Sequence, residues 1–146
     1  MKIFLDTSSL FKLYHKEMGT AELEELFSTV KITTIFLSEI AKIEFTSTVW
    51  KKVRTKEISE SEAHTTLELF EADFAKYSFV ATDSIIIEQA RILATKYGTQ
   101  GLRTLDSIQL STAISLSQQA GVFFTADNLL KFLFNAEGLL TEPPRR

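Results

Sequence analysis

Short apolar runs alternate along the chain with longer segments in which apolar residues recur every three or four positions. The short runs are rich in β-branched and aromatic residues and predict strands at 2–5, 31–36, 78–81 and 122–125, with a weaker strand in "GLLTEPP" at 138–144. The longer segments predict helices at 8–16, 20–29, 38–56, 59–76, 83–97, 104–119 and 127–134. This alternation favours the α/β class, with a parallel sheet covered by helices on both faces.

Residue types at the ends of these segments support the predicted boundaries. Ser59 and Glu62 have the spacing of a capping box, and Thr104 is a suitable N-cap. With Thr104 as the cap, Asp106 stands at the second helical position, and no basic residue lies a turn away to pair with it. We therefore expect Asp106 to depend on the helix dipole or on another partner.

Length and composition indicate one domain without thiol chemistry. The chain has 146 residues, of which 45% are hydrophobic, so it can fill a real core. We assign residues 1–142 to this domain and 143–146 to a C-terminal tail. There is no cysteine, which excludes disulfides and thiolate metal sites. Any metal must be held by oxygen or imidazole.

Charge and the N-terminal region narrow the class of protein further. A net charge of -3 and a pI near 5.4 argue against a general nucleic-acid coat protein, which needs many Lys and Arg side chains on phosphates. The chain does not begin with a basic segment and a long apolar stretch, and no apolar run approaches the roughly 18 residues of a membrane span. We therefore expect a soluble, unexported, cytoplasmic protein.

Three aspartates stand where a predicted strand gives way to a helix. Asp6 directly follows "KIFL", Asp83 comes two residues after "SFVA", and Asp127 comes two residues after "VFFT". Ligands of such sheets bind beyond the carboxyl ends of strands, where the strand order reverses. Each aspartate is equally suited to cap the following helix, because its carboxylate accepts hydrogen bonds from free N–H groups. Position alone leaves both interpretations open.

Two further carboxylates lie in helices where apolar residues are expected. Glu44 is at the border of the apolar stripe of its helix, where a solvated glutamate is the competing interpretation. Asp106 is the one acidic residue of the nearly charge-free segment "TLDSIQLSTAISLS", where a first-turn acid stabilised by the helix dipole is the alternative. Burying an unpaired charge is costly, so a buried carboxylate needs a compensating partner.

Taken together, Asp6, Glu44, Asp106 and Asp127 predict a metal site. Carboxylates gathered at one end of a sheet repel one another unless a divalent cation lies among them. Oxygen ligands favour Mg²⁺, with Mn²⁺ as a substitute. Magnesium held by carboxylates activates water and neutralises the charge that develops on a phosphodiester under in-line attack. The predicted chemistry is metal-dependent hydrolysis of a nucleic-acid backbone.

The sequence resembles the PIN-domain family of nucleases, and within it the VapC-like toxins of toxin–antitoxin pairs. The resemblance rests on segments that span nearly the whole chain in the family's order: "LDTSSLFKLYHKE", "GTAELEEL", "SEIAKIEF", "YGTQGLRTLDSIQLSTAISL", "VFFTADNLL" and "EGLLTEPP". It implies a five-stranded parallel sheet in the order 3-2-1-4-5. The strands before Asp6 and Asp127 would then be neighbours, whereas Asp83 would end an edge strand and keep its cap role.

The resemblance also implies roles for individual residues and for other molecules. The metal-binding and catalytic acids of the family correspond to Asp6, Glu44, Asp106 and Asp127. Thr125 matches the hydroxyl residue two positions before the last acid, and Thr7 or Ser8 matches the small polar position after the first. The implied activity is that of a Mg²⁺-dependent endoribonuclease with RNA as its substrate. The implied partners are a cognate antitoxin and a second copy in a homodimer.

The densest basic cluster includes Lys51, Lys52 and Arg54, near the end of a predicted helix. It suits either a solvated helix end, where cations are favoured by the dipole, or a contact with the RNA backbone. His15 and His64 have no second imidazole at metal-ligand spacing, so we give neither a role.

Two other functions fit parts of the pattern. A PIN-domain nuclease that processes RNA without an antitoxin would share every residue above. A small overlapping reading frame upstream of the gene would separate it from a toxin. A receiver-like signalling module has similar alternation and an acidic pocket, but it needs adjacent acids after the first strand and a lysine after the last. Asp6 stands alone at the first place, and "EGLLTEPP" contains no lysine.

Overall fold

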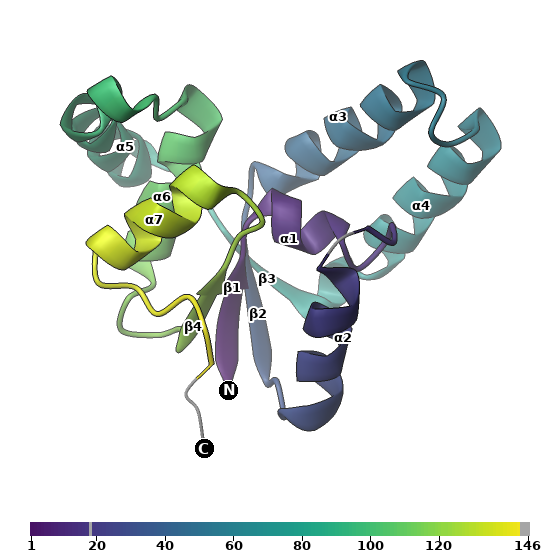
Figure 1. The fold of residues 1–146 in the computed structure, drawn as a ribbon, viewed down its shortest axis with the longest axis horizontal. Coiled ribbons are helices and arrows are strands. Elements are labelled where there is room, and N and C mark those ends of the chain that lie inside the picture. Colours follow the sequence, from purple (N-terminus) through teal and green to yellow (C-terminus); the bar gives the residue numbers. More distant parts are fainter. Residues whose placement is uncertain (18, 144–146) are drawn as a thin grey trace.

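A computed structural model, which describes residues 1–17 and 19–143, contains one parallel sheet in the order β3-β2-β1-β4 (Figure 1). The strands are β1 (Lys2–Leu5), β2 (Thr34–Ser38), β3 (Tyr77–Val80) and β4 (Val122–Phe124). The helices are α1 (Thr7–Phe11), α2 (Thr20–Thr29), α3 (Ala41–Arg54), α4 (Glu60–Ala72), α5 (Ser84–Lys96), α6 (Thr104–Ser115) and α7 (Asn128–Ala136). Short 3₁₀ helices lie at Phe74–Lys76 and Gly98–Gln100. The predicted α/β class is confirmed.

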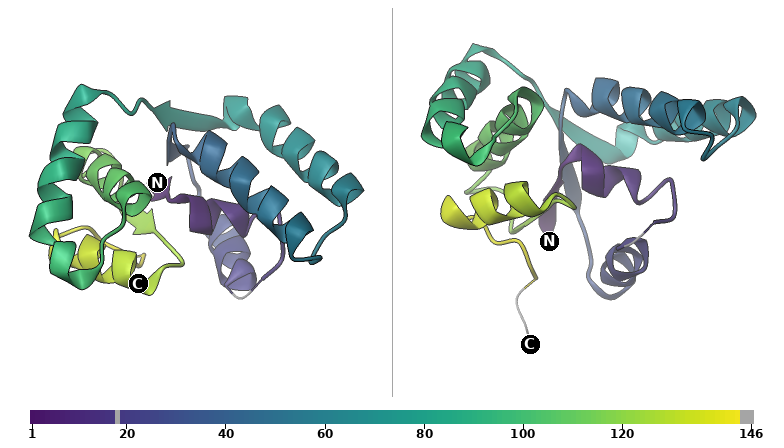
Figure 2. Two further views of the ribbon diagram at one scale, coloured as in Figure 1. Left: turned by 90° about the horizontal axis from the view of Figure 1, so that it is seen from above. Right: turned by 45° about the horizontal axis from the view of Figure 1, so that its top comes forward.

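Helices cover both faces of the sheet (Figures 1 and 2). Successive side chains of a strand point to opposite faces. In β1, Ile3 and Leu5 belong to the core that the sheet shares with α1 to α4, whereas Phe4 belongs to the core shared with α5, α6 and α7. All three side chains are fully buried. Burial on both faces explains why the central strands are continuous apolar runs rather than alternating ones.

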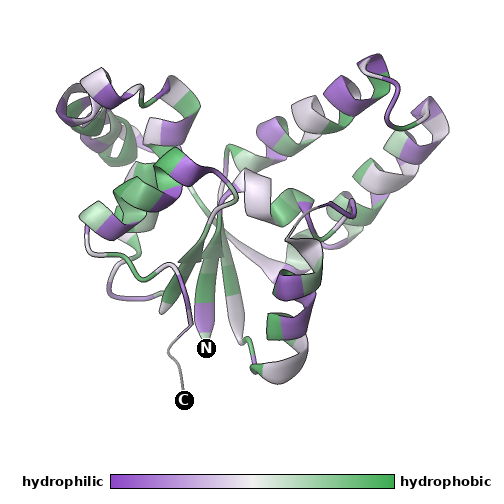
Figure 3. Ribbon diagram, in the orientation of Figure 1, coloured by the Kyte–Doolittle hydropathy of each residue, from purple (hydrophilic) through white to green (hydrophobic). Residues whose placement is uncertain are grey.

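The hairpin of α3 and α4 extends away from the sheet (Figure 1), and its helices carry mixed polar and apolar surfaces (Figure 3). The predicted capping box begins α4: the Glu62 N–H donates to Ser59 Oγ and the Ser59 N–H donates to Glu62 Oε1, both at 3.1 Å. Among residues 1–17 and 19–143, no helix has the length and apolar character needed to cross a membrane.

Several predicted boundaries move because tertiary pairing overrides the local pattern. β2 begins at Thr34, which lies opposite Lys2, and continues through Ser38, which lies opposite Val80 and is fully buried. Residues 31–33 therefore precede the strand. α1 ends at Phe11, because the next N–H groups bond to carbonyls three residues back and tighten the chain into turns.

The predicted fifth strand at 138–144 is wrong within the described residues, where the sheet has four strands. Gly138 ends α7 with a left-handed φ of 80°, and the Leu139 N–H bonds back to the Phe134 carbonyl at 2.9 Å. One backbone hydrogen bond, from Phe123 N to Leu140 O at 2.8 Å, ties the segment to β4. Pro143 then offers no N–H for a ladder. The rest of the predicted tail, 144–146, lies outside the described residues.

Candidate active site

Asp6 ends β1 and caps α1, with only 4% of its surface exposed. Its Oδ1 accepts hydrogen bonds from the Ser9 N–H at 2.9 Å and the Ser8 hydroxyl at 2.8 Å, and its Oδ2 accepts one from the Thr125 hydroxyl at 2.5 Å. Burial raises the pKa of Asp6 to about 6, although these hydrogen bonds favour the ionised form and oppose the shift. Asp6 is therefore a helix cap that keeps a costly buried charge.

Asp127 follows β4 and lies beside Asp6 because β1 and β4 are neighbours in the sheet. It is half-buried and caps α7 by accepting the Leu130 N–H at 2.7 Å. Two hydrogen bonds join the ends of β1 and β4: the Ala126 N–H donates to Ser8 Oγ at 2.9 Å, and the Thr125 hydroxyl donates to Asp6 Oδ2. Within the segment after β4, the Asp127 N–H donates to Thr125 Oγ1 at 3.1 Å. The hydroxyls of Ser8 and Thr125 thus fix the loop that carries Asp127.

Asp83 remains apart from this group. It follows the edge strand β3, is exposed, and caps α5 by accepting the Ile86 N–H at 3.0 Å. Capping is thus common to Asp6, Asp83 and Asp127, and Asp83 differs from the other two in strand order and in exposure.

Glu44 extends from the first turn of α3 toward α1 and α6 and is half-buried. Its Oε1 accepts hydrogen bonds from the Thr7 hydroxyl and from Gln109 Nε2, both at 2.8 Å. Burial raises the pKa of Glu44, and the negative charge of Asp106 adds to the rise, while the two hydrogen bonds oppose it. Thr7 and Ser8, which the sequence leaves as alternatives, both contact an acid.

Asp106 lies in the first turn of α6, which begins at Thr104 as predicted, although Arg103 and not Thr104 is the N-cap. The expectation that no basic residue lies a turn away is wrong, because Arg103 Nε is 3.6 Å from Asp106 Oδ2. The Arg103 side chain is 81% exposed, so this ion pair is weak. Burial raises the pKa of Asp106 and the charge of Asp127 adds to it, with Arg103 acting in the opposite direction.

One cavity of about 290 Å³ brings these acids together at the carboxyl end of the sheet. It is lined by Asp6, Thr7, Ser8, Phe11, Glu17, Glu44, Thr48, Lys52, Arg103, Asp106, Gln109 and Asp127. Of the predicted basic cluster, Lys52 lines the cavity, whereas Lys51 and Arg54 are exposed and do not. Arg103 and Gln109 are not among the residues that the sequence predicts for this site, although both lie three residues from Asp106 on the same helix face, a spacing that could have identified them.

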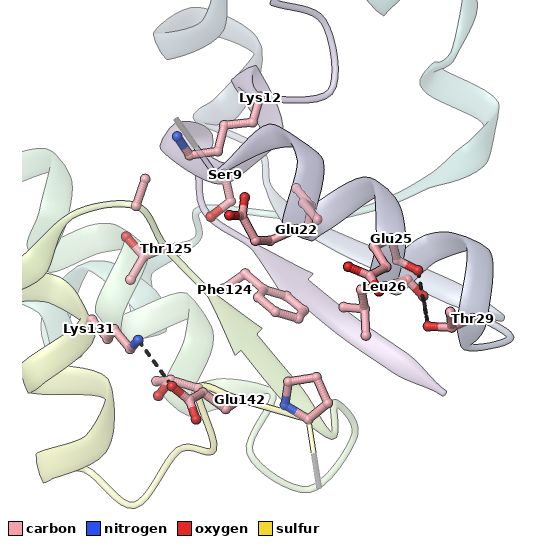
Figure 4. Close-up of a pocket in the computed structure, with 15 residues that line it drawn as sticks. Ser9, Lys12, Glu22, Glu25, Leu26, Thr29, Phe124, Thr125, Lys131 and Glu142 are labelled. Carbon is pink, nitrogen blue, oxygen red and sulfur yellow. Dashed lines mark hydrogen bonds and ion pairs between the residues drawn. The ribbon is translucent and has the colours of Figure 1, made fainter. Parts of the chain in front are cut away.

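A larger cavity, of about 860 Å³, lies between α2 and the chain that follows β4 (Figure 4). Leu26 and Phe124 contribute apolar surface, and Lys131 forms an ion pair with Glu142 at 3.6 Å. None of Asp6, Glu44, Asp106 and Asp127 lines this cavity. The convergent carboxylates therefore belong to the smaller one.

The donor set of the smaller cavity suits a hard divalent cation, because its acids offer oxygen and the chain has no cysteine. In the part of the chain that the structure describes, no three acidic or histidine side chains are close enough to form a complete cage for a metal ion. Magnesium does not need such a cage, since it is commonly held by one or two carboxylates and keeps several waters. The residues present therefore fit this ion.

Comparison with known protein families agrees with this architecture. The family model of the PIN domain matches residues 3–131. The chain belongs to the PIN-domain family. No curated protein matches its sequence. The matched range covers almost the whole chain of this PIN domain and includes the four acids described above.

Solved structures with a similar fold have little sequence identity to this PIN domain. VapC20 from Mycobacterium tuberculosis, described as a toxin that cleaves the sarcin–ricin loop, has a TM-score of 0.71 and 13% identity, over 97% of this chain and 99% of that one. VapBC2 from Rickettsia felis, bound to a DNA fragment from its promoter, has a TM-score of 0.64 and 19% identity, over 97% and 98%. VapBC-1 from nontypeable Haemophilus influenzae has a TM-score of 0.62 and 18% identity, over 97% of each chain. These likenesses establish a shared fold.

Proposed function

We propose that this PIN domain is a Mg²⁺-dependent endoribonuclease, the toxin of a toxin–antitoxin pair, and that Mn²⁺ can replace Mg²⁺. The observation that carries the proposal is the cavity at the sheet's carboxyl end, where Asp6, Glu44, Asp106 and Asp127 meet from different elements. Burial raises the pKa of Asp6, Glu44 and Asp106, so their ionised forms are destabilised and a positive charge among them would stabilise those forms.

In this proposal Asp6, Glu44, Asp106 and Asp127 would surround the cation with negative charge, one or two of them as direct ligands, and the cation would supply Lewis acidity to the phosphodiester and to water. Thr125 and Ser8 keep the Asp6 carboxylate oriented through their hydroxyl donors. Arg103 and Lys52 line the same cavity and supply positive charge for the phosphates of the RNA. Lys51 and Arg54 lie on the exposed end of α3, where they would contact the RNA only outside the cavity.

The proposed partners are an antitoxin, which blocks the acidic cavity, and a second copy of the chain. Support for the antitoxin comes from the VapBC assemblies of Rickettsia felis and Haemophilus influenzae, which share the fold. Support for a homodimer comes from Ile43 on α3 and Ile85 and Ile92 on α5, which are 74%, 77% and 60% exposed. We place the protein in the cytoplasm, where its RNA substrate would be.

Sequencing of RNA ends after induced expression tests this proposal. Expression of the wild type should create new 5′ ends at defined sites, and expression of Asp6→Asn should not, because the amide removes the buried charge but keeps the side chain's shape. The same ends in both samples would contradict the proposal. Rescue of growth by a small gene immediately upstream would support the antitoxin, and its absence would favour an RNA-processing nuclease.

A further inference from the structure

Gln109 is the uncharged member of a hydrogen-bonded group inside the acidic cavity. The side chain is 2% exposed, and its Nε2 donates to Glu44 Oε1 at 2.8 Å and to Thr7 Oγ1 at 3.1 Å. The Thr7 hydroxyl donates in turn to Glu44 Oε1 at 2.8 Å. These bonds close a ring that joins α1, α3 and α6.

The ring determines which way the amide of Gln109 faces. An ionised carboxylate only accepts hydrogen bonds, so the NH₂ group and not the carbonyl must face Glu44. Both N–H groups are then used. The remaining atom, Oε1, is buried and has no hydrogen-bond partner in the described residues. An unpaired buried acceptor is unfavourable, and because Gln109 lines the cavity, a water there can supply the missing donor.

The same ring divides the two oxygens of the Glu44 carboxylate. Oε1 accepts the hydrogen bonds from Thr7 and Gln109, whereas within residues 1–17 and 19–143 no hydrogen bond ends on Oε2. Hydrogen bonds to one oxygen of a carboxylate fix the direction of its other oxygen, and contacts of this kind orient the side chains that bind a metal. A glutamine that only joined three helices could do so away from the cavity. Gln109 instead lies against Glu44, one of the acids that line the cavity.

We propose that Gln109 is a positioning residue of the metal site, which holds the Glu44 carboxylate in place through its NH₂ group and accepts a hydrogen bond from a cavity water at Oε1. The inference rests on the proposed function, because it assumes that Glu44 faces a divalent cation. It assigns a role to a residue that carries no charge and lies one helical turn from Asp106.

Direct measurement of Mn²⁺ binding by calorimetry tests the role without RNA. Gln109→Met keeps an unbranched side chain of similar length and removes both the donors and the acceptor. It should weaken Mn²⁺ binding by about 10- to 100-fold, as loss of a hydrogen-bond partner of a metal ligand does. Ser111→Ala is the matched control: Ser111 is a buried polar residue of the same helix, its hydroxyl bonds to the Ile86 carbonyl, and it does not line the cavity. Its Mn²⁺ affinity should equal that of the wild type.

A double-mutant cycle with Glu44→Gln separates positioning from a general effect on the fold. If Gln109 acts through Glu44, Gln109→Met should change Mn²⁺ affinity by less than about threefold in the Glu44→Gln background. Equal losses in both backgrounds, or wild-type affinity for Gln109→Met, would overturn the inference. Where Gln109→Met does not fold, Gln109→Asn carries the test, because its shorter arm moves the amide away from Glu44.

The experiment also distinguishes failure of the inference from failure of the proposed function. If the wild type binds Mn²⁺ no better than Asp6→Asn does, the metal site itself is absent and the proposed function fails with it. If the wild type binds Mn²⁺, Asp6→Asn does not, and Gln109→Met binds like the wild type, only the role of Gln109 is overturned.

Discussion

At the scale of single residues, Asp6 is a helix cap and a cavity-lining acid at the same time. It accepts the Ser9 N–H, as any N-cap aspartate does, and it also lines the cavity with Glu44, Asp106 and Asp127. The two interpretations that the sequence leaves open are therefore compatible, since the N-terminus of a helix stabilises an anion whatever else that anion binds.

Replacing Asp6 by Asn should stabilise the metal-free protein at neutral pH. Because burial raises the folded-state pKa of Asp6 to about 6, above its usual value in an unfolded chain, the folded state binds more protons between these values. The contribution of Asp6 to stability is thus complete below about pH 4 and falls as the pH rises through about 6. The asparagine amide does not titrate, so the Asp6→Asn variant does not lose stability in this way. We expect Asp6→Asn to melt several degrees above the wild type in EDTA at pH 7.5.

The difference in melting temperature between Asp6→Asn and the wild type should shrink toward pH 4, where the wild-type carboxyl is protonated. Magnesium should raise the melting temperature of the wild type by mass action and that of the variant much less. Melting curves of both proteins, in EDTA and in Mg²⁺, check both effects. A variant that melts lower than the wild type in EDTA, together with equal stabilisation by Mg²⁺, would mean that Asp6 acts as a cap alone.

Lys52 and Lys51 are neighbours of equal charge with different positions. Lys52 lines the cavity and pairs with Glu57 at 3.2 Å, whereas Lys51 is exposed. Lys52→Gln should weaken RNA binding and lower its salt dependence by about one phosphate contact, while Lys51→Gln should do neither. Titration of both variants with RNA at several salt concentrations measures this. Equal losses of RNA affinity in the two variants would indicate a general effect of surface charge and not a contact at the cavity.

At the scale of elements, the pattern of the sequence predicts those features that depend on local chemistry. The capping box of Ser59 and Glu62 forms as expected, because both partners lie within one turn. Predictions that depend on distant partners are less accurate. The start of β2 is determined by its pairing with β1 and β3. Residues 138–143, the described part of the predicted fifth strand, include apolar residues suited to a strand but make one backbone hydrogen bond to β4.

The same division applies to the candidate site. The acids are visible in the sequence because Asp6 and Asp127 closely follow predicted strands and because carboxylates are unusual on apolar helix faces such as those of Glu44 and Asp106. Gln109 is harder to identify, because the sequence shows its three-residue spacing from Asp106 but not its burial. Its contacts with Thr7 and Glu44 form only when α1 and α3 are brought beside α6.

Loss of the α4 cap should destabilise the fold without affecting the proposed chemistry. Ser59→Ala removes the acceptor of the Glu62 N–H and should cost about 1 kcal/mol, or roughly 2–4 °C in melting temperature. Ser61→Ala, the same substitution two residues further on, should be close to neutral, because its side chain makes no capping bond in the structure. Thermal melts of both variants measure the difference. If Ser59→Ala melts like Ser61→Ala, the capping box contributes nothing.

At the scale of the whole molecule, the strand order creates the site. β1 and β4 lie side by side, so Asp6 and Asp127 share one edge of the sheet, while β3 carries Asp83 to the far side. Helices from opposite faces then add Glu44 and Asp106. A cavity assembled from β1, α3, α6 and the end of β4 is possible only when the complete sheet and both helical layers are in place.

The most direct test is RNA cleavage by purified protein with each strand-end or helix acid changed in turn. In Mg²⁺, Asp106→Asn and Asp127→Asn should each lower the rate by about a hundredfold or more, since each removes charge that supports the cation and the developing negative charge on the phosphate. Asp83→Asn, the matched control, should cleave like the wild type. EDTA should abolish cleavage by the wild type and by Asp83→Asn. Comparable losses from Asp83→Asn, or undiminished cleavage by Asp106→Asn and Asp127→Asn, would contradict the assignment of the active site to this cavity.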